Sequence, residues 1–257
     1  MELLRAELRL FLLALSWFTR VPLPRDLGWS PERFSESARY YPAVGVLVGL
    51  VGALVYGLAE RWLPTIPALL LSTLATVRLT GAFHEDGLAD SADGLGGGSS
   101  PERVLEIMKD SRIGSYGALA LILALALKIS CLAGLAAIDP ARVGGALIAA
   151  HALSRLFPTW LLRLLPYARR SGGGKAPATA PPPSRGALWI ASATALVPLL
   201  WLPPAAALLG SGAAAAASLY LAGLMRCRLG GYTGDLLGAV QQVSEIGFLL
   251  GLLAAQG

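Results

Sequence analysis

The chain has 257 residues, of which 55% are hydrophobic and only 14% are charged, and its net charge is +5. Soluble domains carry about 25% charged residues, so this chain has too few charges to cover a soluble surface of its size. Its basic residues gather in loops and form no stripe, and the sequence therefore predicts no nucleic-acid partner. These features favour a membrane protein whose solvent is lipid.

The N-terminal segment, residues 1–42, mixes charged residues with leucines and lacks the features of a signal peptide. Leu4, Leu8, Phe11 and Leu15 are spaced to form one apolar stripe of a helix. An amphipathic helix with such a stripe lies in the plane of the membrane interface. We therefore expect an interfacial helix before the first membrane span.

Seven later segments are long and apolar enough to cross a bilayer, which requires roughly 17–25 residues. The predicted spans are 43–59, 64–81, 115–135, 143–162, 186–202, 205–224 and 236–255. No repeat of fixed period and no soluble second domain interrupts them. The sequence thus predicts one all-α domain over residues 1–257, a polytopic helical bundle with about seven transmembrane helices.

The loops on one side of this bundle carry most of the positive charge. Residues 1–42, 82–114, 163–185 and 225–235 contain 16 of the 21 Lys and Arg residues. The positive-inside rule makes this side cytoplasmic. The segment 163–185 is expected to be a flexible cytoplasmic loop, either a plain linker or a mobile lid for a polyanionic substrate. The sequence leaves open whether the chain forms a homo-oligomer.

An acid-rich segment follows the second predicted span. Asp86, Asp90 and Asp93 are spaced i, i+4 and i+7, so on a helix they share one face, with Glu85 about 100° away. Like charges on one face repel each other without a counter-ion. Clustered carboxylates suit Mg²⁺, which often also binds substrate phosphates. We predict a Mg²⁺ site on the three aspartates, with Glu85 as a further ligand or a base.

The next segment, residues 105–117, contains Lys109 and Arg112 just before the third span. Both side chains suit phosphate oxygens, and Arg112 can bind them in bidentate fashion. Ser115 and the N–H groups that begin the third span could add an anion site. The alternative is an interfacial anchor whose basic side chains reach toward lipid headgroups.

Buried polar residues mark the last and fourth spans. Glu245 lies deep in an otherwise apolar helix, where an uncompensated carboxylate costs several kcal/mol, so we expect a partner for it. Arg155, one turn from His151, is a candidate to neutralise Glu245 or a substrate phosphate. Thr233 and Asp235 are placed to cap the last helix.

These residues lie in stretches that resemble the cobalamin synthase family, also called adenosylcobinamide-GDP ribazoletransferase. The matching stretches are residues 18–22, 41–45, 80–94, 105–117 and 230–245. They follow the family's order along essentially the whole chain, whereas residues 169–183 and 202–218 carry little of the likeness. The resemblance implies a Mg²⁺-dependent membrane enzyme of cobalamin biosynthesis in the cytoplasmic membrane of a prokaryote.

By this resemblance the substrates are adenosylcobinamide-GDP and α-ribazole or its 5′-phosphate, and GMP is released. We expect the metal on Asp86, Asp90, Asp93 and Glu85, and acid–base catalysis from Glu85, Asp235 or Glu245. The residues expected to bind substrate are His84, Lys109, Arg112, Arg155, Tyr232, Thr233, Gln241 and Gln242.

Two other classes compete with this interpretation. CDP-alcohol phosphotransferases also place spaced aspartates on membrane helices, but the Asp-Gly-x-x-Ala-Arg part of their pattern is missing after Gly87. A transporter could use His151, Arg155 and Glu245 as an ion path. Against it, most acids cluster at one face and no inverted repeat is evident.

Overall fold

The computed structural model describes residues 2–24, 26–168 and 180–255, and within these ranges it contains helices but no named strand. An isolated bridge joins Tyr167 to Tyr232. The helices of the bundle are α3 (Tyr41–Ala59), α4 (Thr65–Thr80), α7 (Ser115–Ile138), α8 (Ala141–Leu164), α9 (Arg185–Leu196), α10 (Pro204–Leu229) and α11 (Gly234–Ala254). The predicted all-α fold is confirmed.

Each of the seven predicted spans corresponds to one of these helices. Four stretches of the described chain are long and apolar enough to cross a membrane by themselves: Pro31–Ala59, Ser115–Ile138, Pro204–Leu229 and Gly234–Ala254. The chain is therefore a polytopic helical membrane protein. Helix α4 qualifies only jointly with the next helix, α5 (Phe83–Gly97), whereas α9 is short and α8 carries several charged residues along its length. The count of seven spans remains a prediction.

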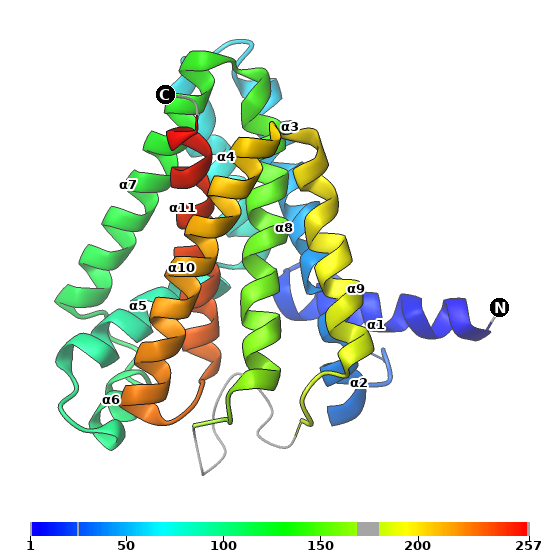
Figure 1. Cartoon of the computed structure of the whole chain (residues 1–257), viewed down its shortest axis with the longest axis vertical. Coiled ribbons are helices and arrows are strands. Elements are labelled where there is room, and N and C mark those ends of the chain that lie inside the picture. The colour runs from blue at the N-terminus through cyan, green and yellow to red at the C-terminus, as the bar shows by residue number, and fades with distance from the viewer. Residues whose placement is uncertain (1, 25, 169–179, 256–257) are drawn as a thin grey trace.

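The helices that are not part of the long bundle lie toward one end of it (Figure 1). They are α1 (Glu2–Phe18), α2 (Pro31–Ser37), α5 (Phe83–Gly97) and α6 (Pro101–Ile107), while two 3₁₀ turns, Ala38–Tyr40 and Val197–Trp201, extend α2 and α9. The same end holds the connection between α10 and α11. It therefore brings together the predicted loops 82–114 and 225–235. Residues 169–179 of the predicted loop 163–185 lie outside the described residues.

Helix α1 projects sideways from the bundle, across the direction of the long helices (Figure 1). Leu4 and Leu8 in its first half are exposed, whereas Phe11 and Leu15 in its second half pack against the apolar cluster around α3. The predicted stripe therefore divides into a part that contacts protein and a part that does not. This arrangement suits a helix at a membrane interface, which remains a prediction.

A sharp turn sends α5 across the bundle axis. Gly81 ends α4 with φ of 68°, a left-handed conformation that glycine adopts readily, and Ala82 follows with φ of 58°. The backbone N–H of Arg20 donates to the carbonyl of Leu79 at 2.8 Å, which ties the turn to the end of α1. As a result, α5 bends away from α4 by 88°.

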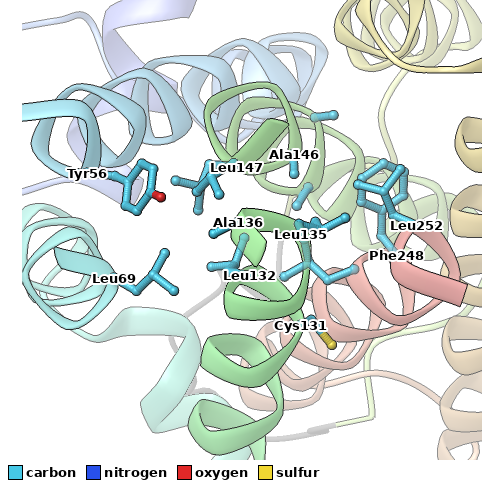
Figure 2. Packing of buried hydrophobic residues seen from close by; sticks show 14 of the residues in the cluster. Tyr56, Leu69, Cys131, Leu132, Leu135, Ala136, Ala146, Leu147, Phe248 and Leu252 are labelled. Atoms are coloured by element: carbon cyan, nitrogen blue, oxygen red, sulfur yellow. The ribbon is translucent and has the colours of Figure 1, made fainter. Parts of the chain in front are cut away.

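Small residues let the long helices approach closely. A Cβ atom added to Gly49 of α3 would lie 2.6 Å from the Cα of Ile148 in α8, and one on Gly251 of α11 would lie 2.6 Å from the carbonyl oxygen of Leu209 in α10. Close backbone approach at small residues is typical of membrane helix packing. Between these contacts lies an apolar core whose labelled members come from α3, α4, α7, α8 and α11 (Figure 2).

Candidate active site

The three predicted aspartates lie on α5, and the predicted helix is confirmed there. Their surroundings differ although they share one stripe. Asp86 is exposed, Asp90 is partly buried, and Asp93 is buried with 8% of its surface exposed. The stripe therefore runs from the surface at the first turn of α5 into protein at its end.

Asp93 fastens α5 to the start of α7. Its two carboxylate oxygens accept hydrogen bonds from the backbone N–H of Gly114 at 2.7 Å and of Gly117 at 2.8 Å. A negative charge is favourable at a helix N-terminus. The sequence predicted an anion site at the N–H groups that begin the third span. Two of these N–H groups bind the carboxylate of Asp93 instead of a separate anion.

Glu85 faces a different part of the molecule. Its Oε1 accepts a hydrogen bond from Nε2 of Gln242 at 3.2 Å, while its Oε2 is buried and has no hydrogen-bond partner among the described residues. Close by, a Cβ on Gly87 would lie 2.6 Å from the carbonyl oxygen of Asp235. The acidic segment and the start of α11 are therefore in direct contact.

Glu245 has the partner that its depth requires, and that partner is Lys128 of α7. The Lys128 Nζ and Glu245 Oε1 atoms are 2.5 Å apart, and the two side chains are 5% and 1% exposed. Nδ1 of His151 lies 3.2 Å from Oε2 of Glu245, and Gln241 donates to the same oxygen at 2.6 Å. Arg155 instead donates to the carbonyl of His151 at 2.7 Å.

Lys128 was not among the site residues predicted from the sequence. The available signal was that Lys128 is the single charged residue of the third predicted span, as Glu245 is of the seventh. Two opposite charges isolated in apolar helices are expected to pair.

Hydrogen bonds connect this buried pair to Glu85. Gln241 donates to Glu245 and to Ser154, Gln242 donates to Gln241 at 3.0 Å, and Gln242 also donates to Glu85. A small cavity lies along this path, with about 180 Å³ of space including the part that is open to the outside. Six predicted site residues line it: His84, Glu85, Arg155, Gln241, Gln242 and Glu245.

The predicted phosphate-binding residues lie at the other end of α5. Arg112 lines an open cleft of about 1040 Å³ together with Asp93 and the start of α7, whereas Lys109 is exposed outside its lining. The guanidinium of Arg112 donates to both oxygens of Asp110, and these bonds lower the pKa of Asp110 to about 2. Arg112 is therefore accessible but already paired with a carboxylate.

Tyr232 and Thr233 shape the turn before α11. The N–H of Tyr232 donates to the carbonyl of Pro166 at 2.9 Å, and its carbonyl accepts from Ala168 at 2.9 Å. Thr233 caps α11 by accepting the N–H of Leu236 at 3.2 Å, as predicted. Both residues hold the backbone of the site.

The carboxylates permit only a limited metal site. No group of three or more His, Cys, Asp or Glu side chains among the described residues is close enough to hold a metal ion. Asp93 and Glu85 accept hydrogen bonds from protein groups. Asp86 and Asp90 lie one turn apart on the stripe, with Asp86 exposed and Asp90 partly buried. Mg²⁺ is often bound by one or two carboxylates plus substrate phosphates and water. Asp86 and Asp90 fit that mode.

Comparison with known proteins finds matches along almost the whole chain. The family described as Cobalamin-5-phosphate synthase matches residues 10–253. A protein of Leptothrix cholodnii named adenosylcobinamide-GDP ribazoletransferase is 49% identical over 256 residues, covering 96% of each chain. Proteins of the same name from Polaromonas sp. and Shewanella piezotolerans are 45% and 43% identical, covering 95% and 96% of this chain and 96% and 95% of theirs. No solved structure matches the chain.

Proposed function

The chain belongs to the Cobalamin-5-phosphate synthase family, and we propose that it joins adenosylcobinamide-GDP to α-ribazole or its 5′-phosphate with release of GMP. The observation that carries the proposal is the contact between α5 and the start of α11. It brings the acidic stripe, Glu85 and Asp235 to one end of the bundle. Acids and bases gathered in this way suit metal-assisted transfer of a phosphoryl group.

In the proposed reaction, the 3′-hydroxyl oxygen of the ribazole forms a bond to the phosphorus on the cobinamide side of the diphosphate. The bond from that phosphorus to the bridging oxygen breaks, and this oxygen leaves with GMP. The hydroxyl proton passes to a base of the protein. No oxidant or reductant is needed.

We assign Mg²⁺ to Asp86 and Asp90, because they lie one turn apart near the exposed start of the stripe. When bound, the ion would neutralise charge on the diphosphate and on departing GMP. Asp93 holds the end of α5 against α7 and thereby fixes the direction of the stripe.

Glu85 is the best-placed base. Gln242 orients one of its oxygens, and the other has no hydrogen-bond partner among the described residues. Glu245 is bound to Lys128 inside the bundle, and hydrogen bonds through Gln241 and Gln242 connect it to Glu85. We therefore give Glu245 a positioning role.

Arg112, with Lys109 nearby on the surface, is assigned to the phosphate of the GMP group. The open cleft that contains Arg112 supports this assignment, because it adjoins Asp93 at the far end of α5. To bind phosphate, the guanidinium must exchange its bonds to Asp110, or share them, at an exposed position.

We further propose that this end of the bundle faces the cytoplasm and that the membrane is the cytoplasmic (inner) membrane of a prokaryote. The excess of Lys and Arg in residues 1–42, 82–114 and 225–235 supports this orientation. The mostly apolar outer faces of α7 and α10 suit a lipid bilayer as the surrounding solvent.

The test is GMP release from adenosylcobinamide-GDP and α-ribazole by the purified protein, with and without Mg²⁺. Asp90→Asn should abolish turnover while the protein stays folded in the membrane. Asp139→Asn, at the opposite end of α7, is the matched control and should keep normal turnover. Absence of Mg²⁺-dependent GMP would refute the activity, and normal turnover by Asp90→Asn would refute the metal assignment alone.

A further inference from the structure

An aromatic cavity lies beside the first turn of α5, at the junction of α1, α2, α3, α8 and α11. Its space is about 550 Å³, including the part that is open to the outside. The ring-bearing residues that line it are Trp17, Phe18, Phe34, Tyr41, Phe83 and His84. Of these residues only His84 was expected from the sequence to bind substrate, and the proposed reaction gives no role to any of the six.

The rings support one another and so form a defined wall. Trp17 packs edge-on against Phe34 with centroids 4.7 Å apart, and Phe83 lies edge-on to Phe18 at 5.7 Å. His84 stacks on Phe18 at 5.4 Å with an angle of 11° between the planes. A wall of aromatic faces and edges favours a flat aromatic ligand.

The cavity offers very few polar groups, and the one permanently charged group in its lining is Arg155. The side chain of Arg155 is buried, and only 2% of the residue is exposed. Nη1 donates to the carbonyl of His151, whereas the buried Nε has no hydrogen-bond partner among the described residues. Arg155 therefore places one positive charge in the lining of an otherwise apolar cavity, and that charge favours a ligand with an acceptor atom over a purely hydrocarbon one.

We propose that this cavity binds the dimethylbenzimidazole base of α-ribazole, an inference that rests on the proposed function. That base is flat and apolar, and its one unsubstituted ring nitrogen accepts a hydrogen bond. Guanine, the base of the other substrate, carries several donors and acceptors that such an apolar wall would leave unsatisfied. The chemistry of the cavity therefore favours the base of α-ribazole over guanine.

The position of the cavity supports the same assignment. Phe83 and His84 immediately precede Glu85, and Gly234 and Gly238 of the lining flank Asp235 on α11. A base held here presents its ribose toward Glu85. Asp90 lies about 7.5 Å beyond Glu85 along α5, five residues at about 1.5 Å each. In this arrangement α-ribazole binds beside the first turn of α5, and the guanosine phosphate of the other substrate binds in the cleft at the last turn of α5.

Steady-state kinetics of the purified full chain test the assignment. Trp17→Leu and Phe34→Leu should each raise KM for α-ribazole about 10-fold, the size expected for loss of a ring that stacks on a base. KM for adenosylcobinamide-GDP should stay within about twofold, and Trp17→Phe should restore most of the affinity. Phe11→Leu is the matched control, because Phe11 lies on the same helix but packs on Tyr40 outside the cavity.

Equilibrium dialysis of radiolabelled α-ribazole with the detergent-solubilised protein gives a readout that needs no turnover. Unlabelled dimethylbenzimidazole should displace the label and guanosine should not. The inference is overturned if guanosine displaces it equally, if Trp17→Leu binds normally, or if the variants raise KM for the corrinoid substrate instead. Absence of GMP formation would refute the proposed function, and dialysis would then still decide what the cavity binds.

Discussion

Replacing Lys128 by methionine removes the ammonium group but keeps a long side chain inside α7. Its partner Glu245 then stays buried with 1% of its side chain exposed and keeps its contacts with Gln241 and His151. At the observed 2.5 Å, and with an effective dielectric constant near 20, the lost attraction is about 7 kcal/mol. Relief of the desolvation cost of lysine offsets part of it, and measured losses for breaking buried pairs are about 3–5 kcal/mol.

We therefore expect Lys128→Met to lower the free energy of unfolding by about 3–5 kcal/mol. The measurement is reversible unfolding of the protein in mixed micelles with increasing SDS, followed by tryptophan fluorescence. The double variant Lys128→Met with Glu245→Gln should recover most of the loss, because no buried charge is left unpaired and glutamine can still bond to Gln241.

Lys109→Met makes the same substitution at an exposed lysine and should change the free energy of unfolding by less than about 0.5 kcal/mol. Two results would refute the reasoning. One is a loss below about 1 kcal/mol for Lys128→Met, and the other is a double variant no more stable than the single one.

Two further substitutions test how α5 is held. Gly87→Ala should destabilise the protein by about 1–3 kcal/mol and slow GMP release, because its Cβ would lie 2.6 Å from the backbone oxygen of Asp235; Gly57→Ala, where a Cβ meets nothing within 4 Å, should be neutral or stabilising in the same unfolding assay. Asp93→Asn should weaken two hydrogen bonds to a charged acceptor, each contributing about 1.5–3 kcal/mol. Hydrogen exchange at the start of α7 should then rise, and unchanged exchange would contradict the fastening role.

Much of the fold follows from hydropathy and spacing. Apolar length located all seven helices of the bundle within a few residues, and the i, i+4, i+7 spacing correctly placed Asp86, Asp90 and Asp93 on one helix. The bend at Gly81 and Ala82 was not predicted, because positive φ at an alanine has no clear signal in a single sequence. Because the bend sets the direction of α5, the sequence could not show which way the aspartate stripe faces.

The surroundings of the site residues were harder to predict, since they depend on packing between distant segments. Sequence spacing cannot show that Asp93 accepts two N–H groups of α7, nor that Lys128 is the partner of Glu245. The aromatic cavity draws its rings from α1, α2, α3 and α5, which no local pattern connects. The substrates were predicted from the family resemblance alone. The structure shows which of the predicted site residues lie at the surface and which are buried in the bundle.

The pairing of Lys128 with Glu245 also constrains how the chain is assembled during its synthesis. Helix α7 emerges from the ribosome long before α11, so it must enter the bilayer while its lysine has no acidic partner. A lysine at a helix centre costs roughly 2.5–3.5 kcal/mol on insertion scales, which the leucines and isoleucines of α7 can offset. Chains that end before Glu245 would therefore retain an unsatisfied charge within the membrane, a feature by which quality control can recognise incomplete protein.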